Sequence, residues 1–332
     1  MSGYPAIRMR RMRRTAGLRR MLDAALPGPE KFIWPAFVLK GSGKREPIEA
    51  MPGQSRLSVD QLLVDVEAIV ATGIGGVLLF GLEEDSAKDS RGSAACREDG
   101  AVQSAVAQLK EEFPRLVVAT DVCLCAYTDH GHCGPLTANG DVDNDAANEV
   151  LAQVALSHAA AGADIVAPSA MMDGQVQAIR AALDANSFTH TIVMSYSSKF
   201  ASAMYGPFRE AEKSAPQQGD RKSYQASCRD LNAALRESRL DEAEGADILM
   251  VKPALFYLDI LARLRAETDL PIAAYNVSGE YSMLHAAAAR GWGDVRGMVR
   301  ESIAAIDRAG ADLIISYWSN QYEAFLTPQA GD

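Results

Sequence analysis

Residues 244–253 read EGADILMVKP, and the order of residue types in this stretch decides the fold. A helical pattern ends at the glycine, the aspartate opens a strand, and an apolar run leads to a lysine. The same order recurs in AGADIVAPSA at 161–170 and in AGADLIISYW at 309–318. Near-continuous apolar runs are typical of parallel strands that are buried on both faces. Repeated helix-to-strand units therefore build the chain.

Eight apolar runs alternate with eight helical runs over the rest of the sequence. The predicted strands cover residues 32–39, 75–82, 115–123, 163–170, 191–197, 246–253, 271–278 and 311–318. The predicted helices cover residues 58–72, 100–113, 144–161, 175–185, 227–244, 257–268, 283–289 and 294–309. This alternation predicts the α/β fold of a (β/α)8 TIM barrel.

An extended N-terminal arm, residues 1–30, is expected to precede a barrel that spans residues 31–332. A barrel of this type uses about 250 residues as a single domain. A doubly wound open sheet is the alternative, but no glycine-rich phosphate fingerprint follows the first strand. Two connections, 123–143 and 198–225, are too long to be simple turns, and long ordered loops are usually binding loops or lids.

Composition excludes several classes of protein. Hydrophobic residues make up 48% of the 332 residues and charged residues 23%, as in a soluble globular protein. No apolar run approaches the ~18 residues of a membrane span, so no membrane partner is expected. Five cysteines and no visible export signal indicate reduced thiols and a cytoplasmic location.

Charge is distributed unevenly along the chain. Residues 1–20 hold seven arginines and no acid, which gives them a charge of +7. Because the whole chain carries −10, the remaining residues carry −17. A basic arm on an acidic body binds either nucleic acid or the body of a sister subunit. We favour the sister subunit, and expect no nucleic acid, because nothing else in the chain resembles a nucleic-acid reader.

Two lysines follow neighbouring predicted strands and are candidate catalytic residues. Lys252 lies in MVKPA, after an apolar strand, and Lys199 lies in SYSSKFAS. Active sites of barrels lie at the carboxyl ends of the strands. Repulsion between two ammonium groups and burial both lower the pKa of a lysine, and a neutral amine attacks a carbonyl to form a Schiff base. The alternative is that each lysine extends to the surface.

Three cysteines, Cys123, Cys125 and Cys133, fall within the segment DVCLCAYTDHGHCG at 121–134. Thiolates at this density in a reducing compartment suggest zinc, and three protein ligands leave a fourth position open for catalysis. His130 or His132 as a fourth ligand would instead make a closed structural site. Unpaired core cysteines are a further alternative, although the segment is polar and rich in glycine.

The loop after Lys199 carries Arg209, Arg221 and Lys222. Arginines in a loop above a barrel mouth suit a carboxylate substrate, through bidentate hydrogen bonds. An ordinary solvated loop explains the same pattern. Further polar residues stand at the strand ends, namely Asp121, Ser169, Ser278 and Tyr317.

At these residues the chain resembles the porphobilinogen synthase family, also called 5-aminolevulinate dehydratase. The resemblance rests on DVCLCAYTDHGHCG, SYSSKFASAMYGPFR, GADILMVKPALFYLDI and AAYNVSGEYSML, and it runs from the arm segment RMRRMRRTAGLRRM to the last strand. It implies the asymmetric condensation of two 5-aminolevulinate molecules into porphobilinogen, an early step of tetrapyrrole synthesis.

The resemblance also implies roles for single residues. Lys252 would form a Schiff base with the substrate that becomes the propionate side, and Lys199 with the one that becomes the acetate side. The matching substrate-binding residues are Ser278 and Tyr317 for the propionate-side carboxylate, Arg209, Arg221 and Gln225 for the acetate-side carboxylate, and Asp121 and Ser169 for the pocket wall.

Metal use varies within the family, and this chain keeps the three cysteines of the zinc-type members. Ala126 departs from the Pro or Glu that the motif often carries there. Glu237, fifteen residues before Lys252, matches a glutamate that holds an allosteric magnesium ion in many bacterial members. A solvated helical glutamate paired with an arginine is the alternative for Glu237. Members are usually homo-octamers whose arms embrace a neighbour, and smaller hexamers also occur, so we expect a homo-oligomer, an octamer foremost.

Two other functions are weighed against this one. A class I aldolase would explain Lys252 but leave Lys199 and the cysteines without a role. A zinc module or nucleic-acid binder would use only the cysteines or the arginine arm, and would retain affinity for DNA at ~200 mM salt.

Overall fold

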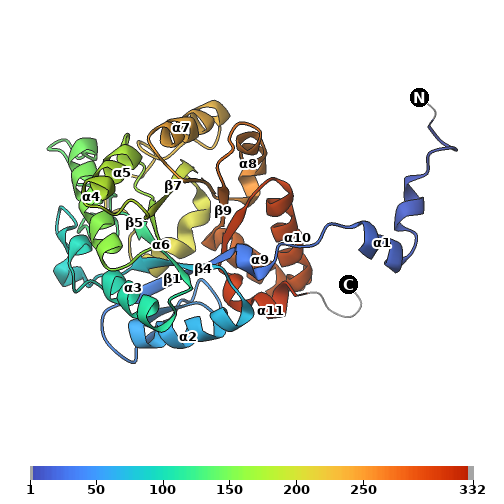
Figure 1. The fold of residues 1–332 in the computed structure, drawn as a ribbon, viewed down its shortest axis with the longest axis horizontal. Helices are drawn as coiled ribbons and strands as arrows, with labels where there is room; N and C mark the ends of the chain where they lie inside the picture. The colour runs from blue at the N-terminus through green and yellow to red at the C-terminus, as the bar shows by residue number, and fades with distance from the viewer. Residues whose placement is uncertain (1–2, 328–332) are drawn as a thin grey trace.

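A computed structural model describes residues 3–327 of the chain. Figure 1 shows a closed barrel ringed by helices, with the N-terminal segment reaching away from it. Eight parallel strands form the barrel, and the first pairs with the last, so the (β/α)8 prediction is confirmed. They are β1 (Phe32–Leu39), β4 (Gly76–Gly81), β5 (Val117–Val122), β6 (Ile165–Pro168), β7 (Ile192–Lys199), β8 (Ile248–Lys252), β9 (Ile272–Asn276) and β10 (Leu313–Ser316).

Helices follow the strands and cover the outside of the barrel (Figure 1). The principal ones are α2 (Val59–Thr72), α3 (Ala101–Glu112), α4 (Asn144–Ala160), α5 (Gln175–Ala185), α7 (Leu231–Ala243), α8 (Leu258–Arg265), α9 (Ser278–Ala289) and α10 (Val295–Arg308). The short helices are α1 (Ala16–Leu22), α6 (Gly206–Glu212) and α11 (Tyr322–Phe325). Single 3-10 turns lie at Met9–Arg13, Pro29–Lys31, Asp85–Ala87, Ser93–Cys96, Ala203–Tyr205, Leu255–Tyr257 and Ser319–Gln321.

Several boundaries differ from the sequence-based prediction. Helix α7 begins at Leu231, rather than at residue 227, because the Asp230 side chain accepts a hydrogen bond from Ala233 N and caps the helix there. Helix α9 begins at Ser278, rather than at residue 283, directly after β9. Two short strands, β2 (Arg45–Pro47) and β3 (Ser55–Ser58), were not predicted. β2 is fully exposed and only three residues long, so it has no apolar alternation to detect.

The repeated glycine–alanine–aspartate segments perform one structural task three times. Gly162, Gly245 and Gly310 have positive φ angles of 106°, 101° and 111° after their helices. Only glycine adopts that conformation readily. The following aspartates, Asp164, Asp247 and Asp312, each accept a hydrogen bond at 2.8 Å from a backbone N–H of the preceding barrel strand, at Val118, Val193 and Ile272. The signature therefore ends a helix and fixes the next strand beside its neighbour.

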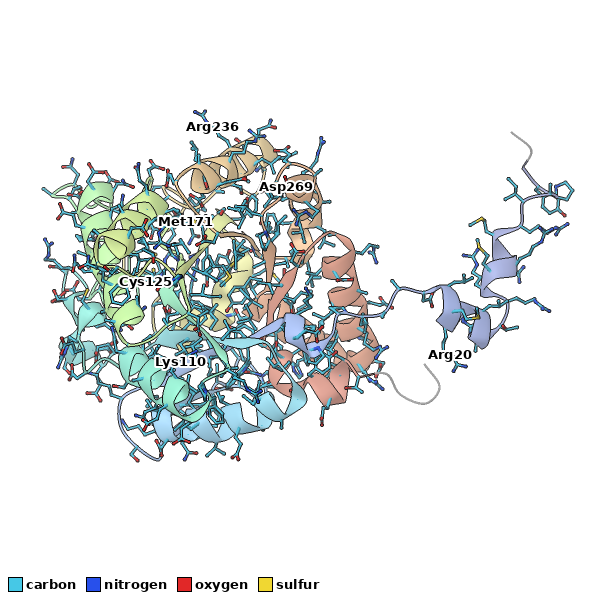
Figure 2. The ribbon with its side chains drawn as sticks, viewed as in Figure 1. Arg20, Lys110, Cys125, Met171, Arg236 and Asp269 are labelled. Atoms are coloured by element: carbon cyan, nitrogen blue, oxygen red, sulfur yellow. The ribbon has the colours of Figure 1, made fainter. Side chains whose placement is uncertain are left out.

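The part of the arm up to α1 reaches away from the barrel in Figure 1, whereas its last residues contact the barrel through the Pro27 and Pro29 carbonyl groups, which accept from Tyr322 Oη and Gly75 N. Met9, Met12 and Met21 on it are 58%, 48% and 81% exposed, and Leu18 is partly exposed. Arg20, labelled in Figure 2, also lies well away from the barrel. An arm with this much exposed apolar surface has too few contacts of its own to be stable alone. Over the described residues, no helix has the length and apolar character that crossing a membrane requires.

The aspartate contacts predict a loss of stability when one is removed. Asp247→Ala leaves the buried Val193 N–H without its acceptor, which costs about 1–3 kcal/mol. Urea unfolding measures the change, and Asp247→Asn, which keeps an acceptor oxygen, should recover most of it. Asp269→Ala, at an exposed loop position, is the control and should stay within ~0.5 kcal/mol. An Asp247→Ala chain as stable as that control would show that the carboxylate is dispensable.

Candidate active site

Two lysines end neighbouring strands at one mouth of the barrel. Lys199 is the last residue of β7, Lys252 is the last residue of β8, and the two are paired across the strands. The register between β7 and β8 shifts between Ser195 and Ser198. Such an irregularity changes the direction of the side chains that follow it in the strand. Both side-chain nitrogens lie over the ring of Tyr196, at 5.4 Å from its centroid for Lys199 and 4.8 Å for Lys252. The predicted shared mouth is therefore present.

Lys252 is buried in an aromatic box. Its Nζ lies 4.2–5.9 Å from the centroids of five rings, those of Tyr275, Tyr196, Phe208, Tyr205 and Phe80. Burial lowers the pKa of Lys252 to about 7, and the charge of Lys199 acts in the same direction. The negative charge of Asp121 opposes both. A large share of Lys252 is therefore a neutral amine near pH 7, which is the nucleophilic form.

Lys199 and Asp121 stand beside this box. The Nζ of Lys199 donates to the backbone oxygen of Ser169 at 2.5 Å, so Ser169 orients this lysine through its main chain. Burial raises the pKa of Asp121 to about 6, although Lys199 and Lys252 lower it. The Oδ1 atom of Asp121 has no hydrogen-bond partner among the described residues. A carboxyl group with a pKa of about 6 at a reacting site can both give and take protons near neutral pH.

Cys123, Cys125 and Cys133 form one buried cluster. Their Sγ atoms all lie within 4.8 Å of one another, Cys123 Sγ stands 3.5 Å from Cys125 Sγ, and all three thiols are free. Hydrogen bonds from Cys123 and Cys125 lower the pKa of Cys133 well below its usual range, and hydrogen bonds with Cys125 and Cys133 raise the pKa of Cys123. Cys125, labelled in Figure 2, lies within the body of the barrel.

The donor set of this cluster fits one divalent ion of soft or borderline character. Three thiols converge, one is already stabilised as a thiolate, and no disulfide competes. The two histidines of the same segment are not part of the group. His132 bonds to Tyr224 Oη and to the Gln218 carbonyl, and His130 bonds to the Ser90 carbonyl and the His132 N–H. A closed site with a histidine ligand therefore has no support here.

Residues 206–225 form a lid over the mouth of the barrel. Hydrogen bonds with residues outside the lid hold it in place. It begins with α6, whose last carbonyl groups, at Glu210 and Ala211, accept hydrogen bonds from Arg56 of β3. Further along, Gln217 donates its side-chain N–H to the Asp129 carbonyl at 2.5 Å. Strand β3, which was not predicted, therefore contributes to the site, because its Arg56 hydrogen-bonds the lid helix α6.

The lid carries Arg209, Arg221 and Gln225, the three residues expected to meet a substrate carboxylate. Arg221 and Gln225 are buried, and Arg221 donates from Nη2 to the carbonyl groups of Gly131 and Ser214. The Nε atoms of both arginines and the amide of Gln225 have no partner among the described residues. Buried donors of this kind cost about 1–3 kcal/mol each when unpaired, so they fit a carboxylate that enters with a substrate.

Ser278 and Tyr317 lie at the ends of β9 and β10, and both are buried. The Tyr317 hydroxyl bonds to the Tyr275 hydroxyl at 3.2 Å, and Tyr275 is the ring nearest Lys252. The Ser278 hydroxyl accepts from Phe208 N of the lid at 3.0 Å. Both residues are therefore adjacent to the lysine box, with Ser278 engaged by the lid.

Known proteins resemble this chain along nearly its whole length. The family model of delta-aminolevulinic acid dehydratase matches residues 6–325. The chain belongs to the delta-aminolevulinic acid dehydratase family. Members named for this activity in Halalkalibacterium halodurans and Escherichia coli are 49% and 50% identical, over 97% and 94% of this chain and 97% and 95% of their own. The structure of the Toxoplasma gondii enzyme in complex with its product porphobilinogen has a TM-score of 0.92 at 41% identity, and covers 95% of this chain and 90% of its own.

Glu237, the predicted magnesium residue, lies apart from the lysines on α7. It lines a cavity of about 770 Å³ together with Asp173, Asp241 and Glu244. Burial raises the pKa of Glu237 to about 7, and the charges of Asp241 and Asp173 add to the shift. No ion pair with arginine is found for it among residues 3–327. These acids do not form a tight ligand group, since the cysteine cluster alone meets that spacing in the described chain.

Two buried acids, Glu280 and Glu212, were not anticipated from the sequence. Glu280 in the first turn of α9 accepts from Leu255 N and Val277 N, at 2.8 and 2.9 Å, and thereby ties the segment after Lys252 to the end of β9. Glu212 in the lid contacts Cys125. In the sequence both fall outside the predicted helices and strands, where a glutamate is expected to be solvated.

The lysine box predicts opposite pH shifts for two variants of this family member. The rate at which borohydride traps an imine on Lys252, formed with a small ketone, should rise as pH increases through about 7, because the amine loses its proton. Lys199→Met removes a repelling charge, so the rise should move to higher pH. Asp121→Asn removes an attracting charge, so the rise should move to lower pH. Two shifts in the same direction would contradict this electrostatic account.

Proposed function

We propose that this chain condenses two molecules of 5-aminolevulinate into porphobilinogen through Schiff bases on Lys199 and Lys252. The observation that carries the proposal is the pairing of two buried lysines in one mouth. Two ketone substrates need two amines, whereas a class I aldolase needs only one lysine. The family membership and the relatives named for this activity support the same reaction.

Each lysine acts by the same steps. The neutral amine donates its electron pair to the ketone carbon, the carbon–oxygen bond breaks, and the oxygen leaves as water once it has gained two protons. Asp121, with its pKa of about 6, is positioned to exchange protons beside both lysines. The iminium then withdraws electrons from the neighbouring carbon, which loses a proton and becomes a carbon nucleophile. One substrate activated in this way attacks the other.

The carboxylates of the two substrates are assigned by family motif and by position. Lys252 takes the propionate-side substrate, whose carboxylate meets Ser278 and Tyr317. Lys199 takes the acetate-side substrate, whose carboxylate meets Arg209, Arg221 and Gln225. The unpaired donors of those three lid residues support the second assignment. Ser169 orients Lys199 and lines the pocket with Asp121.

We assign the cysteine cluster to zinc. Cys123, Cys125 and Cys133 would hold the ion, and their buried thiols fit its preference for sulfur ligands. When bound, zinc supplies a Lewis acid that polarises a carbonyl group or lowers the pKa of a water molecule. Arg221 balances the negative charge of the cluster, because the thiolates raise its pKa although burial opposes this. Thiols that must stay reduced favour the cytoplasm.

We further propose a homo-octamer in which the arm docks on a neighbouring subunit. The exposed methionines and the seven arginines of the arm both gain from such a contact, since apolar surface is buried and charges meet the acidic body. Glu237 would hold a magnesium ion through water molecules, because its neighbouring acids are too widely spaced to bind directly. A magnesium ion that prefers one assembly shifts the population toward it.

Single lysine variants should separate the two roles. Lys252→Ala should abolish turnover and borohydride trapping of 5-aminolevulinate, because it removes the amine that burial keeps largely neutral near pH 7. Lys199→Ala should lower turnover by about 10³-fold or more and still allow trapping at Lys252, read by mass spectrometry. Lys44→Ala, at an exposed lysine, is the control. Near-normal activity of Lys252→Ala would end this mechanism.

The zinc assignment predicts a stoichiometric ion with Zn–S distances near 2.3 Å by X-ray absorption. Cys133→Ser should weaken zinc binding and lower activity together, because it removes the stabilised thiolate. Cys228→Ser, at an exposed cysteine outside the cluster, should change neither. Full activity after exhaustive chelation, with no zinc found by elemental analysis, would refute the assignment.

The assembly proposal predicts a smaller particle when the arm is removed. Light scattering on a chain without residues 1–25 should show loss of the full-length assembly, because the exposed methionines and arginines of the arm are gone. Magnesium should shift the size distribution of the full-length chain, and Glu237→Gln should abolish that response. A truncated chain with unchanged assembly would show that other surfaces hold the subunits together.

A further inference from the structure

Glu280 is a fully buried acid that takes no part in the proposed reaction steps. It lies in the first turn of α9. Its Oε1 atom accepts a hydrogen bond from Leu255 N at 2.8 Å, and its Oε2 atom accepts from Val277 N and Asn276 Nδ2, both at 2.9 Å. Among residues 3–327, no ion pair is found for this carboxyl group. Three hydrogen-bond donors therefore take the place of a cation in compensating its burial.

The hydrogen bonds continue from Glu280 to the end of the next strand. Asn276 is the last residue of β9, and its Oδ1 atom accepts from the Ser316 hydroxyl at 3.0 Å. Ser316 is the last residue of β10, and its Oγ atom accepts in turn from Trp318 N at 3.3 Å. Asn276 and Ser316 are also paired in the sheet, and both are fully buried. Glu280, Asn276 and Ser316 thus form one buried network, the strand-end network.

The strand-end network brackets the two residues assigned to the propionate-side carboxylate. Ser278 stands between Val277, whose N–H group donates to the network, and Glu280 itself. Tyr317 directly follows Ser316, and the backbone N–H group after Tyr317 is bound to the Ser316 hydroxyl. A buried polar network with satisfied partners holds its members in one arrangement, because breaking it leaves buried groups unpaired. The network therefore fixes where Ser278 and Tyr317 stand.

Lys252 is held by contacts of its own. Its carbonyl group accepts from Phe200 N at 2.9 Å and from Tyr205 Oη at 3.3 Å, and neither residue belongs to the strand-end network. The network reaches this part of the chain only at Leu255, beyond the lysine. A change in the network is therefore expected to move the carboxylate-binding residues relative to the amine, while the amine stays in its aromatic box.

We propose that Glu280 is a positioning residue for the substrate that reacts at Lys252. Through the strand-end network it fixes the distance from that amine to Ser278 and Tyr317. This distance selects substrates whose ketone and carboxylate are separated by the carbon atoms that lie between them in 5-aminolevulinate. The proposal deepens the proposed function and rests on it in taking Ser278 and Tyr317 as the carboxylate site. Such positioning matters, because a misplacement of about 1 Å can slow a reaction about 100-fold.

Two matched ketones measure this distance in the full chain. One is 4-oxopentanoate, which has the ketone and the carboxylate of the substrate without its amine, and the other is pentan-2-one, which lacks the carboxylate. Borohydride traps either ketone as an imine on Lys252, and peptide mass spectrometry measures the adduct at this lysine. Burial raises the pKa of Glu280 to about 7 and lowers that of Lys252 to about 7. At about pH 8 the carboxyl group is therefore mostly ionised and the amine mostly neutral.

Two variants break the strand-end network at different points. Glu280→Gln keeps the shape of the side chain but replaces one acceptor oxygen by an N–H donor that faces another donor. Trapping of 4-oxopentanoate should fall about tenfold or more, while trapping of pentan-2-one should stay within about twofold of the parent. Ser316→Ala removes only the bonds at the end of β10, so it should lower the same ratio by a smaller factor. Glu301→Gln, at an exposed position of α10, is the control and should change neither rate.

The ratio of the two trapping rates separates positioning from a general loss of structure. A loosened barrel would slow both ketones alike and lower the melting temperature without changing the ratio. Equal losses for the two ketones in both Glu280→Gln and Ser316→Ala, or an unchanged ratio in both, would overturn the proposal. A parent chain that traps the two ketones equally well would instead refute the assignment of Ser278 and Tyr317 to the carboxylate, and a parent that forms no imine on Lys252 would refute the proposed function.

Discussion

The candidate active site depends on a buried environment that keeps much of the Lys252 amine neutral. A charged lysine is stabilised by water, so Lys252 needs a water-excluding box to hold its pKa at about 7. Five aromatic rings from separate parts of the barrel and the lid build that box. Lys199 adds a repelling charge, and Asp121 supplies the opposite charge that prevents the pKa from falling further. The closed barrel and its lid are what make this balance possible.

The lid links the parts of the site that the chain order keeps separate. It contributes Phe208 to the lysine box and Arg209, Arg221 and Gln225 to the proposed carboxylate site, and its Glu212 contacts Cys125. It is held by Arg56, by the cysteine segment and by Ser278. One segment of the chain therefore carries side chains of the lysine box and of the proposed carboxylate site, and it contacts the cysteine cluster.

Sequence patterns predicted the structure correctly wherever a residue interacts mainly with its own backbone or with residues close to it in the chain. The three glycine–alanine–aspartate segments are an example, since positive φ and a strand-capping carboxylate are both encoded within a few residues. The start of α9 was placed too late because Ser278 was included in the preceding predicted strand and Glu280 read as a polar loop residue. In the structure the Glu280 carboxylate is buried and accepts backbone N–H groups from two different segments. Only the fold brings Leu255 and Val277 to it.

The sequence by itself determined the barrel, the two lysines at one mouth and the three clustered cysteines. These follow from apolar periodicity and from residue spacing, and both are local properties of the chain. The tertiary structure alone decided the environment of each group. The aromatic rings around Lys252 come from residues 80 to 275, Arg56 meets a lid more than 150 positions later, and Glu212 reaches Cys125 across 87 positions. Desolvation and long-range contacts have no signature in a linear pattern, because they arise only when distant segments pack together.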